Sequence, residues 1–271
     1  MGWLQRTASD TQVTHRDRLW LYVVAAIIML LLVIPTFIVI PMSFSDSQYL
    51  EFPPSNWSVR WYDEYFGSSK WMRATVTSFQ IGVLTMLVAT PLGTAAAYAL
   101  FVSGHRAARA VFMFVITPMI VPVILIAIGA FYAFGRVGLN NTLTGLVLAH
   151  TVLAAPLVMI VITAALRSYD LNQELVARSL GASRFKAFFM ITLPQIKFSV
   201  VTAALLSFLT SFDEVIIAIF VSGGVNATLT KHMFAALRDY IDPTIAAIST
   251  IMVLVSSVLL LATQFIGNRQ K

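Results

Sequence analysis

The chain has 271 residues, of which 58% are hydrophobic and 11% are charged, and its mean hydropathy is +0.83. Soluble domains carry about 25% charged residues. Because 18 basic and 12 acidic side chains cannot cover the surface of a water-soluble globule of this length, the composition excludes an ordinary soluble enzyme. The chain also has no cysteine, which excludes a disulfide framework and a thiolate metal site.

Long uncharged intervals fill most of the chain and predict membrane-spanning helices. About 20 apolar residues, at a rise of 1.5 Å each, cross a hydrocarbon layer of about 30 Å. The predicted spans lie near 19–43, 75–101, 111–135, 142–166, 197–221 and 245–267. The sequence therefore predicts an all-α membrane protein with six transmembrane helices in one domain, 19–267. An N-terminal tail, 1–18, precedes this domain and a short C-terminal tail, 268–271, follows it.

The basic residues indicate how this bundle is oriented. Twelve of them lie in the two tails, in the connections near 102–110 and 167–196 and at the foot of the fifth span, whereas six lie on the opposite side. Cytoplasmic loops of membrane proteins are enriched in Lys and Arg, so both termini are expected in the cytoplasm. The asymmetry also accounts for the net charge of +6 and the pI near 9.8. No nucleic-acid partner is needed to explain the basic composition.

The first long outer loop, 44–74, is rich in aromatic residues. Trp57, Trp61, Tyr62 and Trp71 lie there among charges of both signs. Aromatic rings with a polar edge favour the interface between membrane and water. We therefore expect a short helix near 58–66 that lies on the outer membrane surface.

The longest inner connection, 167–196, is typical of two short helices joined at Gly181. Asp170 or Asn172 can cap the first helix, Gly181 can end it, and Ser183 can cap the second. The second helix carries phenylalanines and basic residues, and a proline restricts its exit into the next span. These residues are Arg184, Phe185, Lys186, Phe188, Phe189, Leu193 and Pro194. An exposed phenylalanine cluster on a small cytoplasmic knob indicates a docking surface for a partner.

This connection resembles the cytoplasmic signature of ABC importer permeases, which is Glu-Ala-Ala, three residues, Gly, nine residues, Ile, one residue and Leu-Pro. The matching residues are Ala177, Gly181, Ile191, Leu193 and Pro194. The chain departs from the signature at its start, where Leu175 and Val176 replace the usual glutamate and alanine. Glu174 lies one place before the position of that glutamate.

Further segments, within about residues 19–267, resemble the polyamine (spermidine/putrescine) branch of this family. They are Trp61-Tyr62, Ala149-His150-Thr151, Pro156, Ser211-Phe212-Asp213-Glu214 and the run from Asp242 to Thr250. The resemblance implies the type I ABC importer permease fold in the inner membrane of a bacterium. It also implies a second homologous permease as a heterodimer partner, a cytoplasmic ATPase dimer that binds Mg-ATP, and an extracytoplasmic substrate-binding protein. No cofactor is expected in this chain itself.

The same resemblance makes residues 170–190 the coupling helix that docks in a groove of the ATPase. The residues that it assigns to ATPase coupling are Glu174, Ala177, Gly181, Ala182, Ser183, Arg184, Phe185, Phe188, Phe189, Leu193 and Pro194. The phenylalanines, with Arg184 or Lys186, would transmit closure of the nucleotide-bound ATPase dimer.

Two carboxylates, Asp213 and Glu214, lie in the outer half of the fifth span. A charged carboxylate at the centre of a span costs about 2.5–3.5 kcal/mol on an insertion scale, so both are expected to face protein, water or a cation. Glu214 shares one helical stripe with Thr210, whereas Asp213 lies about 100° away. These three residues are candidates for a substrate pathway that attracts a cation. The alternative is a hydrogen-bonded or ion-paired strut that holds helices together.

Other residues within the spans predict packing rather than chemistry. His150 has no second histidine or carboxylate at metal-ligand spacing, which favours a hydrogen bond between helices over a metal site. Gly93 and Ala97, four residues apart, permit close helix approach. Prolines inside spans permit bends, either for gating or for bundle geometry alone. These prolines are Pro91, Pro118, Pro122 and Pro156.

The sequence contains no Gly-rich phosphate-binding loop, no Gly-x-Ser-x-Gly and no His-Glu-x-x-His motif, so it predicts a transport subunit rather than an enzyme. We expect a permease subunit of a binding-protein-dependent importer for a small organic cation, a polyamine such as spermidine or putrescine, with ATP hydrolysed by a separate subunit. The alternatives are a permease of the same family for another small solute, a stand-alone secondary carrier that uses Asp213 and Glu214, and a membrane scaffold without transport.

Overall fold

The computed structural model describes residues 14–105 and 107–267, with side chains as far as 261. The predicted tails, 1–18 and 268–271, therefore lie largely outside the described residues. The α-helices are α1 (Leu19–Met42), α2 (Arg60–Gly67), α3 (Ser69–Ser103), α4 (Ala107–Ile116), α5 (Val123–Val137), α6 (Leu143–Arg167), α7 (Asn172–Ser179), α8 (Arg184–Ala187), α9 (Leu193–Phe212), α10 (Ile216–Val221), α11 (Leu229–Asp239) and α12 (Thr244–Gly267). Three short segments join them, the 3-10 turns η2 (Thr117–Met119) and η4 (Gly224–Asn226) and the π-helical turn η3 (Phe188–Thr192).

The helices match the membrane fold class that the sequence predicts. In the described part of the chain, five helices are long and apolar enough to cross a membrane, or six if one bent pair counts as a single span. The five are α1, α3, α6, α12 and the continuous helical stretch Arg184–Phe212. The β pairing found among the described residues is one isolated bridge between Ser45 and Trp57.

The chain forms two compact units. One comprises the residues up to Tyr65 together with Ile241–Val253, and the other comprises Phe66–Tyr240 together with the residues from Leu254 onward. In the first unit, α1 is apolar along its whole length and has no buried residue. The helix α2 forms where the sequence predicts an interfacial helix, and Trp61 on it is buried.

The third predicted span, 111–135, is not one continuous helix. The segment made of α4 and η2 meets α5 at an angle of 94°. Pro122 takes an extended conformation directly before α5, with φ −52° and ψ 126°, and it has no N–H to continue the preceding helix. Pro91 and Pro156 lie inside α3 and α6 without ending them. Of the four prolines expected to permit bends, only Pro118 and Pro122 therefore lie at a break between helices.

The fifth predicted span, 197–221, is extended at its first end and interrupted near its second. Helix runs without a break from Arg184 to Phe212, and Pro194 lies in the first turn of α9, directly after the π-helical turn η3. A wider π turn loosens the hydrogen-bond ladder at the point where the proline has no N–H to donate. Pro194 therefore does not separate the connection from the span. At the other end, α9 stops at Phe212 and α10 starts at Ile216.

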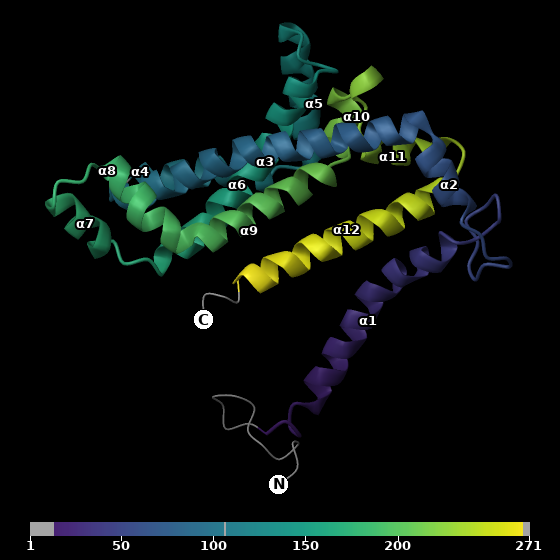
Figure 1. Cartoon of the computed structure of the whole chain (residues 1–271), viewed down its shortest axis with the longest axis horizontal. Coiled ribbons are helices and arrows are strands. Elements are labelled where there is room, and N and C mark those ends of the chain that lie inside the picture. The colour runs from purple at the N-terminus through teal and green to yellow at the C-terminus, as the bar shows by residue number, and fades with distance from the viewer. Residues whose placement is uncertain (1–13, 106, 268–271) are drawn as a thin grey trace. The chain divides into compact units, whose positions relative to one another are not determined.

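Three long helices, α3, α6 and α9, pack pairwise and form the core of the second unit (Figure 1). One buried cluster lies where α6 ends and α9 begins, and consists of Ala97, Val158, Met159, Ile162, Leu166, Tyr169, Ile196 and Ala203. A second cluster joins α3 and α6 to α5 and α10, and consists of Ile81, Ala127, Leu146, Val147, Ala149, Ile217 and Val221. Figure 1 shows α7 and α8 at one end of the three long helices and α10 and α11 toward the opposite end.

Gly93 permits the close approach of α3 and α6 that its spacing with Ala97 predicts. A Cβ atom at Gly93 would lie 2.7 Å from Cγ1 of Val158 and 2.9 Å from the carbonyl oxygen of Ala155. We expect Gly93→Ala to lower the free energy of unfolding by about 1–3 kcal/mol, because the two backbones must separate. Gly129→Ala in α5 is the matched control, since a Cβ there meets no described atom within 4 Å. Thermal unfolding of both variants in detergent tests this expectation, and equal Tm values would contradict it.

Candidate functional site

The connection between α6 and α9, residues 167–196, folds into the two short helices that the sequence predicts. We call it the α6–α9 loop. Asp170 Oδ1 accepts the N–H of Asn172 at 3.0 Å where α7 starts. Ser183 Oγ accepts the N–H of Lys186 at 3.2 Å where α8 starts. Gly181 turns the chain between them with φ of +93°, a conformation that residues with a Cβ rarely adopt.

The exposed surface of the α6–α9 loop carries several large apolar side chains among polar and basic ones. Leu180 is 83% exposed and Phe185 is 75% exposed, and the rings of Phe185 and Phe189 lie 4.6 Å apart. Leu175 and Val176, at the positions of the signature glutamate and its neighbouring alanine, are exposed as well. Large apolar side chains exposed in this way are typical of a docking surface.

The other predicted coupling residues of the loop divide between two hollows. Ala177, Gly181 and Ala182 line the first, of about 300 Å³, together with Lys186 and Met190. The second is a groove of about 660 Å³ against α3, and its lining includes Arg184, Phe185, Phe188, Phe189 and Leu193. The structure thus brings small residues of the loop, Ala177, Gly181 and Ala182, together in one hollow and its phenylalanines together in the other.

Glu174 does not lie on the exposed surface of the loop. Its side chain is 1% exposed, and its carboxylate accepts hydrogen bonds from Tyr98 Oη at 2.6 Å and from Thr192 Oγ1 at 3.0 Å. Glu174 was expected among the residues that contact the ATPase, but its carboxylate contacts residues within the chain instead. The physical reason is that a shift of one residue turns a side chain by about 100° around a helix.

His150 makes the interhelical hydrogen bond that the sequence predicts. Its Nδ1 lies 2.8 Å from Oγ of Ser211, and Oγ of Ser211 lies 3.3 Å from Oγ1 of Thr85. All three side chains are buried. This chain of polar groups links α6, α9 and α3 in the middle of the core.

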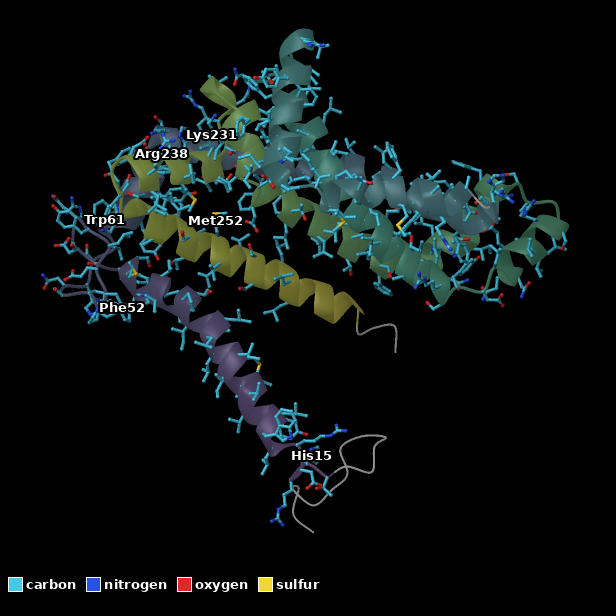
Figure 2. The ribbon with its side chains drawn as sticks, turned by 180° about the vertical axis from the view of Figure 1, so that it is seen from behind. His15, Phe52, Trp61, Lys231, Arg238 and Met252 are labelled. Carbon is cyan, nitrogen blue, oxygen red and sulfur yellow. The ribbon has the colours of Figure 1, made fainter. Side chains whose placement is uncertain are left out.

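Glu214 and Lys231 hold the two ends of α10. Glu214 Oε1 accepts the N–H of Ile217 at 2.9 Å, and Lys231 Nζ donates to the carbonyl oxygens of Ile219, at 3.1 Å, and Ser222. Figure 2 shows Lys231 on α11. Burial lowers the pKa of Lys231, while the two carbonyl oxygens accept hydrogen bonds from its ammonium group. The carboxylate thus pairs with one free N–H at the N-terminal end of α10, and the ammonium pairs with two carbonyls at its C-terminal end.

Asp213 lies in the break between α9 and α10. Unlike the carboxylate of Glu214, its carboxylate does not cap a helix. Its backbone N–H ends α9 by donating to the carbonyl of Leu209 at 3.0 Å. Its side chain is exposed, and its carboxylate has no hydrogen bond or ion pair with any residue of the described ranges. Thr210, one turn earlier, donates its hydroxyl to the carbonyl of Leu206 at 2.9 Å. Of the three candidate pathway residues, Asp213 is the one that is exposed and whose side chain makes no hydrogen bond to the described residues.

The sequence model of one protein family, described as the binding-protein-dependent transport system inner membrane component, matches residues 89–271, which is more than half of the chain. The chain belongs to this family. It is therefore a permease subunit of an importer, and its task is transport rather than catalysis.

Two relatives resemble this permease over most of their length. Over 241 residues it is 32% identical to the putrescine transport system permease protein PotI of Escherichia coli strain K12, which covers 86% of the permease and 85% of the relative. Over 239 residues it is 30% identical to the spermidine/putrescine transport system permease protein PotC of Haemophilus influenzae, which covers 88% and 92%.

Solved structures confirm the fold that the sequence predicts for the permease. A chain of a bacterial ABC transporter involved in the import of the acidic polysaccharide alginate matches it with a TM-score of 0.70 at 14% identity, over 97% of the permease and 99% of that chain. A chain of the MetNI methionine ABC transporter in an inward-facing conformation matches with a TM-score of 0.55 at 18% identity, over 75% and 99%.

The residues of the permease that form hydrogen bonds with Glu174 could not be predicted from the sequence. Tyr98 lies in a predicted span, 76 residues from Glu174 along the chain, and no motif marks it. Thr192 lies between the Ile and the Leu-Pro of the signature. This position is the one feature of the sequence that could have drawn attention to it. No motif marks Lys231 either, because its contact with α10 depends on the fold.

Proposed function

We propose that this permease carries a small organic cation of the polyamine class, such as putrescine or spermidine, as one subunit of an ATP-driven importer. The observation that carries this proposal is its similarity, over most of both chains, to two permeases whose names state putrescine and spermidine/putrescine transport. The exposed carboxylate of Asp213 at the break between α9 and α10 supplies matching chemistry.

Asp213 can attract a polyamine because its charge lacks a partner within the described chain. An ammonium and a carboxylate attract each other more strongly in a partly dehydrated path than in bulk water. A break in a helix also leaves backbone carbonyls that accept hydrogen bonds from a passing cation. Glu214 keeps the break in place by capping α10, so the two neighbouring carboxylates have different roles.

Competition for uptake by the complete transporter tests the substrate class. The permease, its partner permease and its ATPase are reconstituted in proteoliposomes with the binding protein, and uptake of labelled putrescine is measured. Excess spermidine should suppress this uptake, whereas butanediol and succinate, which have the carbon chain of putrescine but no ammonium groups, should not. Equal suppression by butanediol, or transport of another solute without transport of putrescine, would overturn the polyamine assignment.

We propose the following partners for the permease. The α6–α9 loop docks on a cytoplasmic ATPase dimer that binds Mg-ATP, a second homologous permease completes the pathway as a heterodimer, and an extracytoplasmic binding protein delivers the substrate. The exposed apolar patch around Leu180 and Phe185 supports the first contact, and the family description supports the dependence on a binding protein.

We also propose that the permease lies in a bacterial inner membrane with both termini and the α6–α9 loop in the cytoplasm. The excess of Lys and Arg on that side supports this orientation. Tyr98, which contacts the loop, and Ser69, which shares a hollow with Val225, are separated along α3 by about 40 Å at 1.5 Å per residue. The loop and Val225 therefore belong on opposite sides of the membrane.

Single cysteines test this orientation without a background, because the chain has no native cysteine. Leu180→Cys and Val225→Cys each place one thiol at a strongly exposed position. A membrane-impermeant maleimide added to spheroplasts should label Val225→Cys at once and Leu180→Cys only after permeabilisation. The reverse pattern would contradict the proposed orientation.

A further inference from the structure

The carboxylate of Glu174 is the centre of a buried hydrogen-bonded cluster that joins three elements. Its Oε1 accepts from Tyr98 Oη on α3 at 2.6 Å, and its Oε2 accepts from Thr192 Oγ1 on η3 at 3.0 Å. Oη of Tyr169, just after α6, lies 3.0 Å from Oγ1 of Thr192. Glu174 is 1% exposed and Thr192 is completely buried. Each oxygen of the carboxylate therefore holds a different part of the fold to α7.

The hydroxyl hydrogens of this cluster are donated in one order, from Tyr169 to Thr192 and from Thr192 to Glu174. An ionised carboxylate can only accept, and Thr192 has one hydroxyl hydrogen. If Thr192 donates that hydrogen to Glu174, Tyr169 must donate to Thr192. Burial raises the pKa of Tyr169, which keeps its hydroxyl protonated for this task. All four groups are then satisfied without any contribution from solvent.

Tyr98 also connects this cluster to the aromatic part of the loop. Its ring lies 4.6 Å from the ring of Phe188, and Phe188 lies 5.1 Å from Phe189, which is half exposed. One residue of α3 therefore contacts both arms of the α6–α9 loop, α7 through a hydrogen bond and η3 through a ring contact. Movement of either arm must carry α3 with it or break one of these contacts.

We propose that Glu174 is a positioning residue for energy coupling, which fastens the α6–α9 loop to α3 so that movement of the loop on its ATPase reaches the membrane helices. The inference rests on the proposed function for the presence of an ATPase, but not for the identity of the substrate. Leu175, at the position of the signature glutamate, is exposed. In this chain the carboxylate therefore acts within the permease, and an apolar side chain takes its place on the surface.

A role in coupling and a role in stability predict different amounts of substrate carried per ATP hydrolysed. If Glu174 only stabilises the fold, a variant should assemble in lower yield, but the assembled transporters should keep the normal ratio of uptake to ATP hydrolysis. If Glu174 transmits movement, assembled transporters should hydrolyse ATP and carry less substrate for each ATP. The ratio measured on purified, assembled complexes therefore separates the two roles.

Three variants of the complete transporter in proteoliposomes make the test. We expect Glu174→Ala to lower the ratio of putrescine uptake to ATP hydrolysis about tenfold, because two buried hydroxyls lose their acceptor. Glu174→Gln should stay within about twofold of the native ratio, since its amide oxygen can accept from Tyr98 and its NH₂ can donate to Thr192, whose hydroxyl then turns to Tyr169. Gln173→Ala is the matched control, because the bond of Gln173 with Gln195 is exposed and contributes little.

Two results would overturn the inference. An unchanged ratio in assembled Glu174→Ala transporters would show that the cluster does not transmit movement. A loss in Glu174→Gln as large as in Glu174→Ala would assign the effect to the charge rather than to the position. If Glu174→Ala does not assemble, Tyr98→Phe serves instead, because it removes one hydrogen bond and keeps the ring contact with Phe188. An unchanged ratio of uptake to ATP hydrolysis in Tyr98→Phe would also contradict the inference.

A measurement without substrate separates this inference from the proposed function. A spin label at Leu180→Cys, on the exposed tip of the loop, should become more mobile when Glu174→Ala is added and not when Gln173→Ala is added. Unchanged mobility would contradict the fastening of the loop. Absence of putrescine uptake by the native transporter, with the mobility change present, would contradict only the substrate.

Discussion

Phe185→Asp should abolish the association of the permease with its ATPase and leave the permease folded. Phe185 is 75% exposed and its ring contacts Phe189 at 4.6 Å, so little packing within the chain is lost. At an interface, truncation of a buried aromatic anchor costs about 2–4 kcal/mol, and a carboxylate enclosed there without a partner adds to this cost. We expect the affinity to fall by at least about 100-fold.

Copurification at increasing ATPase concentration measures this loss. Val225→Asp is the matched control, because it makes the same kind of change at an exposed apolar residue near the opposite end of α3. Val225→Asp should bind the ATPase as the native permease does. Native-like binding by Phe185→Asp would show that the ATPase docks elsewhere than on the α6–α9 loop.

Asp213→Asn should lower polyamine uptake by about tenfold or more without lowering the yield of the assembled transporter. The amide retains the size of the side chain and removes the charge that attracts the cation, and hydrogen bonds to charged groups contribute about 1.5–3 kcal/mol. The backbone N–H of Asp213, which ends α9, is unaffected by the change. The loss should appear in the transport rate at low substrate, measured on complexes of equal amount.

Glu214→Gln is the matched control for Asp213→Asn. Glu214 Oε1 accepts the N–H of Ile217, and an amide oxygen can accept the same hydrogen bond. We expect uptake by Glu214→Gln to stay within about twofold of native, with at most a small fall in Tm from the weaker cap. Equal losses of uptake and assembly in Asp213→Asn would show that Asp213 is a structural strut.

The periodicity and composition of the sequence were sufficient for the fold class, because membrane spans depend on long apolar runs alone. They could not locate every break. Pro122 explains the bend before α5 in terms that the sequence contains. No proline or glycine marks the end of α9 at Phe212. Beyond this end, α10 is held by Glu214 in the break and by Lys231 on α11.

The sequence predicts those parts of the candidate site whose structure depends on neighbouring residues or on a single residue type. Gly181 acts through its own backbone and Ser183 through a hydrogen bond to a residue three places along. His150 has no metal-ligand partner in the sequence, and it forms a hydrogen bond with Ser211 on a neighbouring helix. Glu174 shows the limit of such reasoning, because its assignment followed a signature that is displaced by one residue. Whether its carboxylate faces a partner or the interior depends on Tyr98 and Thr192, which the fold brings to it.

The dependence of putrescine uptake on the ATPase tests the central claim most directly. Proteoliposomes that contain the permease with its partner permease and ATPase, and proteoliposomes that contain this chain alone, are loaded with ATP on the side of the α6–α9 loop and receive binding protein and labelled putrescine on the other side. We predict accumulation of putrescine only in the complete transporter, and only with hydrolysable ATP. Full uptake by the chain alone, without ATP, would contradict the account and identify a stand-alone carrier.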